Sequence, residues 1–297
     1  MSSGCASPSV SVVVASHNEG ARLRETVHSL LAGLPADGEI VVVDDVSTDG
    51  SAERLTSGYG GVTVLRPPAR VGAIEARNLG ARAARGAVLV FSDAHIEAPL
   101  GWVRPLLAAL AQPHVGAVGP AISAIGRPAS VGYGFRWRDA AMTVEWLGRQ
   151  AEEPYPVPML GAGFLAIRRD TFFATGGFDA GLLLWGCEDA ELCLRLWTLG
   201  LECIVVPTVD VGHFFRPAHP YRIHWDVVLH NMLRVGVVHF GTDRLRRLVE
   251  RLTPNRSFPT AFARLASGDA WDRRRAMRAA RRFDDEWFFT RFCMTAH

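Results

Sequence analysis

Residues 9–20 have the sequence S-V-S-V-V-V-A-S-H-N-E-G, and this stretch decides which class of fold the chain predicts. Its β-branched first half is typical of a buried strand. The apolar run ends at three polar residues, His17, Asn18 and Glu19. Apolar residues at helical spacing then predict a helix over residues 21–34. A buried strand, a polar loop and a helix in this order form the beginning of a βαβ unit.

The same alternation continues as far as residue 118. The further predicted strands cover residues 40–43, 62–65, 88–91 and 115–118, and the further predicted helices cover residues 51–55, 74–84 and 102–110. Strands and helices that alternate at this pace favour right-handed crossovers and a mostly parallel sheet. We therefore predict an α/β fold, in which a Rossmann-like, mostly parallel sheet is flanked by helices.

The composition is that of an ordinary globular protein. Of the 297 residues, 48% are hydrophobic and 21% are charged, and 32 basic side chains, all of them arginine, nearly balance 30 acidic ones. A chain of this length buries enough surface for a large core, so disorder and a disulfide-stapled scaffold are excluded. Five cysteines without a C-x-x-C pair indicate buried thiols in a reducing compartment.

Charge divides the chain near Gly241. Residues 1–240 hold 19 arginines and 23 acidic residues, whereas residues 241–297 hold 13 arginines and 7 acidic residues. We therefore predict a main domain over residues 1–240 and an Arg-rich helical C-terminal extension over residues 241–297. Within it, residues 269–292 combine arginines and aromatic residues on a predicted amphipathic helix. We expect its aromatic face to pack on the main domain; peripheral membrane contact is one alternative and nucleic-acid binding another, and we expect no nucleic-acid partner.

Polar clusters follow three of the predicted strands. They are His17-Asn18-Glu19, Asp44-Asp45, and Asp93 with His95. In open α/β sheets ligands bind at the carboxyl ends of the strands. We therefore expect the three clusters to line a single cleft.

These clusters have the chemistry of a metal and nucleotide site. Asp93 and His95 suit a divalent cation that takes oxygen and nitrogen ligands, such as Mn²⁺ or Mg²⁺. His213 could be a third ligand, although a histidine beside two phenylalanines is more often a core residue. Carboxylates could bind a base or ribose, and arginines could neutralise phosphate charge. The carboxylates are those of Asp44 and Asp45, and the arginines are Arg70, Arg77 and Arg216.

A second group of motifs lies between residues 158 and 200. Residues 161–166 match the dinucleotide pattern G-x-G-x-x-A, but they follow prolines rather than a long strand, so we reject a dinucleotide site. Glu188 and Asp189 come at the start of a predicted helix, whose dipole keeps their pKa values low unless burial opposes it. Two carboxylates beside Trp185 indicate acceptor or sugar chemistry.

The motifs together resemble the GT-A nucleotide-sugar glycosyltransferases of the family 2 type. More closely, the chain is similar to the catalytic domain of polypeptide N-acetylgalactosaminyltransferases, from about Ser9 to Val238. The resemblance rests on S-H-N-E-G, V-V-D-D-V-S-T-D, R-V-G-A-I-E-A-R-N, F-S-D-A-H-I-E, W-G-C-E-D and H-F-F-R, and Pro220-Tyr221, Asn231 and Arg234 also fall where that family has similar residues. It implies a GT-A fold, a UDP-sugar as donor substrate and Mn²⁺ or Mg²⁺ as cofactor.

The resemblance also implies a role for each matching residue. Asp93, His95 and His213 would hold the metal against the diphosphate. His17 and either Asp44 or Asp45 would contact the nucleoside, and Arg70 would reach the uridine or diphosphate. Arg77 would lie near the donor sugar, Gly163 and Glu188 would sit at the sugar, and Trp185 would pack against the donor. Arg216 and Tyr221 would belong to a mobile loop that closes over the nucleotide.

The chain departs from the pattern in two ways. The peptide-modifying family has an asparagine at the position of Asp189, whereas inverting family 2 enzymes have Glu-Asp, with the aspartate as general base. We predict that Glu188 and Asp189 are catalytic and favour inversion of the anomeric centre, with retention left open. The sequence shows neither the membrane anchor nor the lectin domain of the animal enzymes, so we expect a cytoplasmic enzyme that meets membranes at most peripherally.

The sequence thus predicts a metal-dependent glycosyltransferase that moves a hexose or an N-acetylhexosamine from a UDP-sugar to an acceptor. The acceptor stays open among peptide side chains, natural products, glycans and lipid carriers. A nucleotidyltransferase is one alternative, but a chain without lysine cannot supply the Gly- and Lys-rich phosphate loop usual in those enzymes. A non-catalytic nucleotide-sugar-binding protein is the other alternative.

Overall fold

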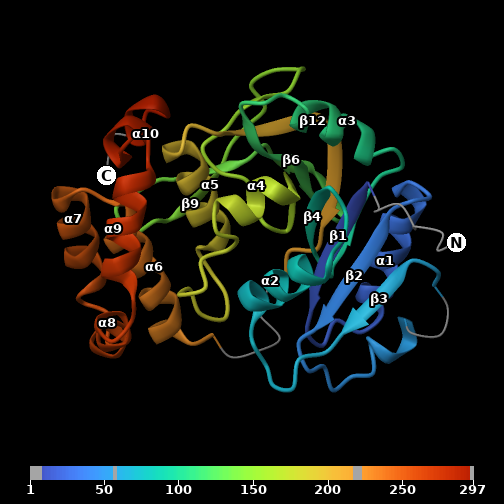
Figure 1. The fold of residues 1–297 in the computed structure, drawn as a ribbon, viewed down its shortest axis with the longest axis horizontal. Helices are drawn as coiled ribbons and strands as arrows, with labels where there is room; N and C mark the ends of the chain where they lie inside the picture. The colour runs from blue at the N-terminus through green and yellow to red at the C-terminus, as the bar shows by residue number, and fades with distance from the viewer. Residues whose placement is uncertain (1–8, 56–58, 217–222, 295–297) are drawn as a thin grey trace, which may run out of the picture.

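The computed structural model describes residues 9–55, 59–216 and 223–294. Its centre is a ten-stranded sheet, whose strands lie between Val10 and His213 (Figure 1). Eight strands follow the order β10-β12-β6-β11-β4-β1-β2-β3, while β5 pairs with β12 and β7 pairs with β6. The strands are β1 (Val10–Ser16), β2 (Glu39–Asp44), β3 (Val62–Leu65), β4 (Val88–Asp93), β5 (Ile96–Glu97), β6 (Val115–Ala124), β7 (Arg127–Gly132), β10 (Tyr155–Pro156), β11 (Phe164–Arg168) and β12 (Glu202–His213), and a separate hairpin consists of β8 (Phe135–Trp137) and β9 (Val144–Trp146).

Helices cover the sheet and form a separate group at the C-terminal end. They are α1 (Ala21–Gly33), the 3₁₀ turn η1 (Glu53–Leu55), α2 (Ala73–Ala83), α3 (Val103–Leu110), α4 (Arg169–Ala174), α5 (Glu188–Thr198), α6 (Trp225–His239), α7 (Thr242–Leu252), α8 (Phe258–Ala266), α9 (Ala270–Ala280) and α10 (Asp285–Arg291). The predicted α/β class is confirmed, because β1 pairs in parallel with β2 and β4, and β2 with β3. The sheet is mixed beyond β4, where β11 lies antiparallel between β4 and β6.

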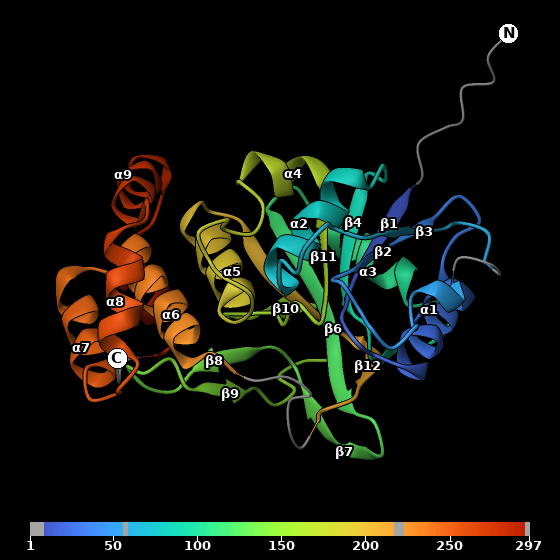
Figure 2. The same cartoon turned by 90° about the horizontal axis from the view of Figure 1, so that it is seen from below.

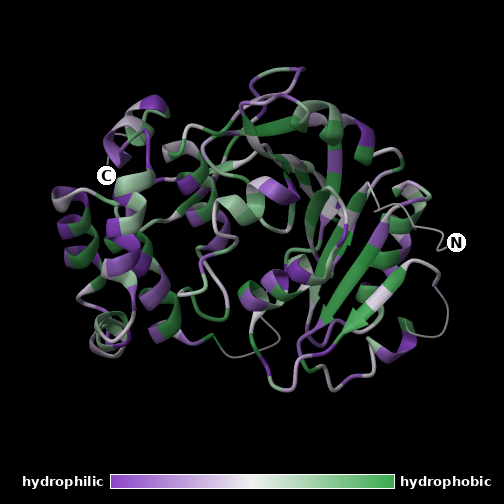
Figure 3. Ribbon diagram, in the orientation of Figure 1, coloured by the Kyte–Doolittle hydropathy of each residue, from purple (hydrophilic) through white to green (hydrophobic). Residues whose placement is uncertain are grey.

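Alternating side chains of the buried strands supply two hydrophobic layers. On β1, Val12 and Val14 belong to one layer, to which α1 contributes Val27 and α3 contributes Leu106. Val13 belongs to the other layer, together with residues of α2 and α5. Figure 2 shows α1 and α2 on opposite sides of the strands. Because both faces are covered, the strands are apolar along most of their length, as the green colour in Figure 3 shows.

Helices α6–α9 lie together at the left of Figures 1 and 2. The single amphipathic helix predicted over residues 269–292 is wrong, because α9 ends at Ala280 and α10 begins at Asp285. The predicted aromatic packing is confirmed for α10, whose Phe289 is buried and stacks on Trp137 with ring centroids 6.1 Å apart. The division at residue 240 stays a prediction.

No helix in the described part of the chain has the length and apolar character needed to cross a lipid bilayer. Trp271 on α9 is half exposed, and the three arginines at positions 273–275 follow it closely in the sequence. Peripheral membrane contact through the extension therefore stays a prediction.

Candidate functional site

The carboxyl ends of β1, β2 and β4 meet at one edge of the sheet. Ser16 is paired with Asp44, and Ala15 is paired with Asp93, so the polar residues that follow each strand lie side by side. This register brings the three clusters predicted from the sequence to one edge.

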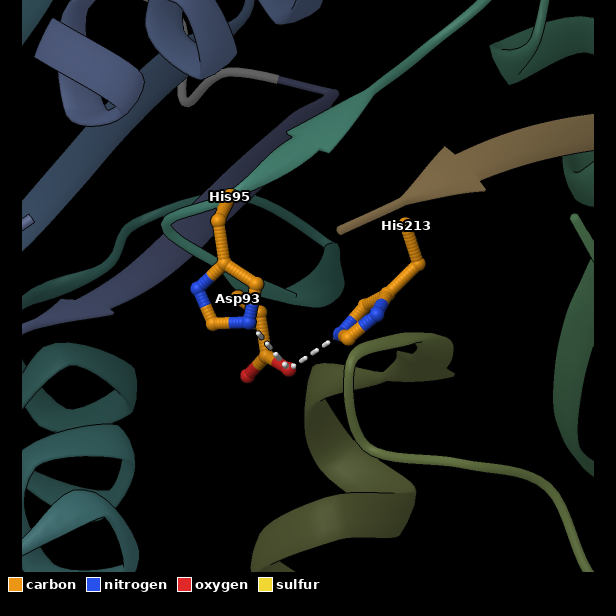
Figure 4. A group of neighbouring side chains, drawn as sticks. All are labelled: Asp93, His95 and His213. Atoms are coloured by element: carbon orange, nitrogen blue, oxygen red, sulfur yellow. Dashed lines mark hydrogen bonds and ion pairs between the residues drawn. The ribbon is translucent and has the colours of Figure 1, made fainter. Parts of the chain in front are cut away.

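Asp93, His95 and His213 form a compact group, which we name the metal group. The side-chain atoms with which they could bind a metal all lie within 4.8 Å of one another. Figure 4 shows the two imidazoles approaching the Asp93 carboxylate from different elements. His213 Nε2 lies 3.1 Å from Asp93 Oδ2, and His95 Nε2 lies 3.9 Å from the same oxygen. His213 therefore belongs to this group rather than to the hydrophobic core.

The pairing of β5 with β12 brings His213 to this place. His213 is paired with Ile96, and the Phe214 N–H donates to the His95 carbonyl at 3.0 Å. A short ladder of backbone hydrogen bonds thus fixes two histidines that are far apart in the sequence.

The donor set fits a hard or borderline divalent cation. Neighbouring ligands of an octahedral ion lie about 3 Å apart when each bond is ~2.1 Å, which is close to the 3.1 Å between His213 and Asp93. Burial alone would raise the pKa of Asp93, but the hydrogen bond from His213 and the charge of Arg77 outweigh it and hold the pKa well below its usual range. The carboxylate is therefore ionised, as a metal ligand must be.

Glu19 lies beside one of the imidazoles. Its Oε1 is 3.3 Å from Nδ1 of His95, a distance typical of an ion pair, but the geometry is not that of a hydrogen bond. Its other oxygen accepts a hydrogen bond from Arg216. The sequence places Glu19 in a polar cluster, but only the fold shows that it touches His95.

Arg77 on α2 connects the metal group to the start of α5. Its guanidinium donates to Asp93 Oδ1 and to Glu188 Oε1, each at 2.7 Å. The second oxygen of Glu188 accepts from the Gly186 N–H at 2.8 Å. Burial would lower the pKa of Arg77, but the charges of Asp93 and Glu188 outweigh it and raise the pKa.

Asp189 is the carboxylate at which burial opposes the helix dipole. Although it lies in the first turn of α5, burial among protein atoms and then the charge of Glu188 raise its pKa to about 7. The hydrogen bond from the Ala190 N–H and the charge of Arg77 offset only part of this effect. The helix dipole therefore does not keep this pKa low.

Gly163 permits the close approach of the strand ends. A Cβ at this position would lie 3.0 Å from Asp93 Oδ2 and 3.5 Å from Cδ2 of His213. Its carbonyl oxygen accepts from the Asp93 N–H at 2.9 Å. Gly163 thus borders the metal group directly.

A pocket of about 310 Å³ opens onto these residues. Its polar end holds Arg77, Asp93, His213, Glu188 and Asp189. The pocket also has an apolar wall, which comes mainly from the hairpin β8–β9 and the segment after β12. That wall is formed by Phe135, Trp137, Met142, Val144, Trp146 and Phe215, and Trp185 lies at its rim with 40% of its surface exposed. No sequence motif predicted this wall, because its residues lie outside the pattern of alternating strands and helices.

The residues predicted to contact the nucleoside lie beside β1 and β2. Asp45 accepts hydrogen bonds from the Val71 and Gly72 N–H groups at 2.7 and 2.9 Å, and Arg70 Nε lies 3.6 Å from its Oδ2. Nδ1 of His17 lies 2.7 Å from the Asp45 carbonyl oxygen. Both oxygens of Asp45 can accept a further hydrogen bond, as a contact with the nucleoside would require. The contact itself stays a prediction.

Asp44 is held by a residue that the sequence did not single out. Its side chain is fully buried and accepts from Arg66 at 2.7 Å and from the Ser47 N–H at 3.0 Å. Tyr221, the remaining predicted residue, lies outside the described residues.

The comparison with family models decides the family. The model of glycosyl transferase family 2 matches residues 11–173, which is more than half of the chain. The chain belongs to glycosyl transferase family 2. A second model, described as the N-terminal domain of galactosyltransferase, matches residues 147–220 of this family 2 protein.

Curated relatives of this family 2 protein include polypeptide N-acetylgalactosaminyltransferases. It is 32% identical to polypeptide N-acetylgalactosaminyltransferase 3 of Taeniopygia guttata over 78% of this chain and 42% of the relative. It is 30% identical to polypeptide N-acetylgalactosaminyltransferase 10 of Rattus norvegicus over 96% of this chain and 49% of the relative. The chain thus spans about half the length of the curated relatives it matches.

Solved structures confirm the predicted GT-A fold. The crystal structure of GalNAc-T7 with UDP, GalNAc and Mn²⁺ has a TM-score of 0.80 and 28% identity, and the match covers 98% of this family 2 protein and 58% of that chain. The mannosyltransferase PcManGT from Pyrobaculum calidifontis, in complex with GDP-Man and Mn²⁺, has a TM-score of 0.58 at 20% identity over 98% of this chain and 87% of that one. The second likeness concerns the fold alone.

Proposed function

We propose that the protein is a metal-dependent glycosyltransferase that transfers a hexose or an N-acetylhexosamine from a UDP-sugar to an acceptor. The observation that carries this proposal is the convergence of Asp93, His95 and His213 beside a pocket that also holds Arg77 and two carboxylates. A relative solved with UDP, GalNAc and Mn²⁺ supports the choice of donor and cation.

The residues at the polar end of the pocket would together promote cleavage of the bond between the sugar and UDP. Asp93, His95 and His213 would hold a divalent cation, which supplies Lewis-acid stabilisation of charge on the leaving diphosphate. The bond between the anomeric carbon and the phosphate oxygen breaks, its electron pair leaves with UDP, and the carbon gains oxocarbenium character. Glu188, kept in place by Arg77, would orient the sugar.

Asp189 would act as the general base. It takes the proton of the acceptor hydroxyl while the acceptor oxygen bonds to the anomeric carbon. A pKa of about 7 suits a base that works near neutral pH. Direct attack opposite the leaving UDP inverts the anomeric centre, so an α-linked donor gives a β-linked product.

The remaining predicted residues would bind the rest of the donor. The nucleoside and diphosphate would lie along His17, Asp45 and Arg70, and Arg216 would neutralise phosphate charge. Gly163 and Trp185 would border the sugar, and the apolar wall would receive the acceptor. We assign catalysis to residues 1–240 and place the enzyme in the cytoplasm, since the described cysteines are free thiols.

A release assay tests this function. The protein is incubated without acceptor in a panel of UDP-sugars, with Mn²⁺ or with a chelator, and UDP is measured. Slow hydrolysis of one donor that stops on chelation is expected, and early proton NMR of the freed sugar should show the β anomer. If no UDP-sugar is hydrolysed and calorimetry detects no UDP binding with Mn²⁺, the proposal is wrong.

A further inference from the structure

Asn231 lies on α6 and is fully buried, yet all of its hydrogen bonds go to one loop beside the pocket. Its amide nitrogen donates to the carbonyl oxygens of Leu183, Trp185 and Gly186 at 2.9, 3.1 and 3.0 Å. Its Oδ1 accepts from the Leu183 N–H at 2.8 Å. One side chain thus lies within hydrogen-bond distance of four backbone groups of residues 183–187, which we name the 183–187 loop; its two amide hydrogens are shared among the three carbonyl oxygens.

The backbone of the 183–187 loop is strained. Leu184 and Cys187 have φ values of 51° and 70°, in the left-handed region that disfavours residues with a side chain. The Trp185 N–H donates to the Leu183 carbonyl at 2.6 Å and closes a three-residue turn around Leu184. Such turns are rare and persist only where the surrounding structure fixes them. Asn231 supplies hydrogen bonds that can fix this one.

The loop is also held from the opposite side. The Ile74 N–H donates to the Leu184 carbonyl at 3.3 Å, at the beginning of α2. A Cβ on Gly72 would lie only 2.4 Å from the Cα of Leu184, so only glycine allows this contact. The loop therefore lies between α6 and the helix that carries Arg77.

The 183–187 loop determines where two pocket residues lie. Trp185 borders the pocket, and the Gly186 N–H donates to Glu188 at 2.8 Å. Glu188 in turn accepts from Arg77. A change in the loop would therefore displace the groups at the sugar end of the site. Of the predicted nucleoside contacts, His17 lies in the loop that follows β1, and Asp45 meets the 183–187 loop indirectly, through the Gly72 N–H.

We propose that Asn231 is a positioning residue for the donor sugar: it holds the 183–187 loop so that Trp185 and Glu188 face the pocket. This inference rests on the proposed function, because the sugar is that of the UDP-sugar donor. In the described part of the chain, every hydrogen bond of the Asn231 side chain goes to this loop, so its effect reaches the sugar through Trp185 and Glu188.

The first test is Asn231→Ala, assayed by Mn²⁺-dependent UDP-sugar hydrolysis and by calorimetry with UDP. We expect kcat/KM to fall about tenfold or more, because small displacements of positioning groups are costly, while UDP affinity stays within about twofold. Ser11→Ala is the matched control, since Ser11 is fully buried and bonds Glu39 and the Gly86 N–H at the opposite end of β1. The control should lower the melting temperature and leave kcat/KM unchanged.

A double-mutant cycle with Trp185→Ala separates positioning from mere stability. If Asn231 acts through the loop, the effects of the two substitutions on kcat/KM are less than additive; additive effects would overturn the inference. Unchanged kcat/KM in Asn231→Ala, or an equal loss of UDP affinity, would also overturn it. If the wild type hydrolyses the UDP-sugar and Asn231→Ala does so equally well, only the role of Asn231 is refuted. If the wild type hydrolyses no UDP-sugar, the proposed function itself is refuted.

Amide hydrogen exchange gives a readout that needs no substrate. The more conservative Asn231→Ser serves if the alanine variant does not fold. Exchange of the Leu183 N–H, which Asn231 protects, should be about tenfold faster or more in this variant, while exchange in β1 stays unchanged. Unchanged exchange at Leu183 would overturn the inference.

Discussion

The guanidinium of Arg77 lies 2.7 Å from the carboxylate of Glu188, and both side chains are almost fully buried. The partners come from α2 and from the first residue of α5, which are more than a hundred residues apart in the chain. A buried ion pair is tolerated only while both charges are present, because a single buried charge is strongly unfavourable. The pair therefore couples the stability of the fold to the integrity of the pocket.

Replacing Arg77 by methionine should strongly destabilise the protein. Arg77→Met leaves the charges of Glu188 and Asp93 without their partner, and we expect a loss of about 3–5 kcal/mol in the free energy of unfolding. Urea denaturation measures it. Arg82→Ala, which removes an exposed pair with Glu75 on the same helix, should cost less than about 1 kcal/mol. Equal losses in the two variants would contradict the assignment.

Asp93→Asn should weaken Mn²⁺ binding about tenfold or more, because it replaces an ionised ligand by a neutral amide. Calorimetric titration of the protein with Mn²⁺ in the presence of UDP measures the change. His114→Ala is the control, because His114 is exposed and lies 4.0 Å from Glu202, outside the metal group. Wild-type affinity in Asp93→Asn would exclude this residue from the metal site.

Gly163→Ala should also weaken Mn²⁺ binding while leaving the fold intact. The added Cβ would lie 3.0 Å from the Asp93 carboxylate, which Arg77 and His213 hold in place, so the ligand geometry must shift. Mn²⁺ titration and circular dichroism measure affinity and fold. Gly148→Ala, where nothing lies within 4 Å of the new Cβ, should behave as the wild type. Unchanged affinity of Gly163→Ala for Mn²⁺ would show that the metal group adapts to the added methyl group.

The pH profile of donor turnover should carry the signature of Asp189. Burial and the neighbouring charge of Glu188 raise its pKa to about 7, so the base is protonated below this pH and ionised above it. With Mn²⁺ saturating, kcat/KM for hydrolysis of the UDP-sugar, in which water takes the place of the acceptor hydroxyl, should rise with pH up to about 7 and then level off. Asp189→Asn should lose most of the activity together with this limb. If the variant still shows the rise of kcat/KM with pH, that rise comes from another titrating group.

The same carboxylate should make stability depend on pH. Its pKa rises from 3.8 in the unfolded chain to about 7 in the folded one, so the folded state binds the proton more tightly. This stabilising contribution is fully present below pH ~4 and is lost as pH rises through about 7. The melting temperature of Asp189→Asn relative to the wild type should therefore increase from pH ~4 to pH ~8. A difference that is constant with pH would contradict the raised pKa.

The N-terminal half of the fold could be predicted from periodicity alone. The β-branched runs place β1, β2 and β4 within one or two residues of their observed ends, because buried parallel strands need continuous apolar sequence. Since the carboxyl ends of such strands meet, the polar clusters at Asp44 and Asp93 could also be brought together in advance.

Other features depend on packing that no local pattern encodes. The approach of His213 to Asp93 requires β12 to pair with β5 across a long stretch of sequence. The pKa of Asp189 depends on how many protein atoms surround it, and the sequence could say only that burial would oppose the helix dipole. The apolar wall around Trp146 needs a small hairpin outside the main sheet.

The pairing of β5 with β12 has a consequence for the order in which the protein assembles. His95 and His213 become neighbours only after the chain between them, more than a hundred residues long, has closed into one loop. Closure of so long a loop is slow and depends on many contacts made earlier. A cation that needs both imidazoles binds the completed fold and stabilises it by mass action. During refolding, high-affinity Mn²⁺ binding should therefore mark the end of the process.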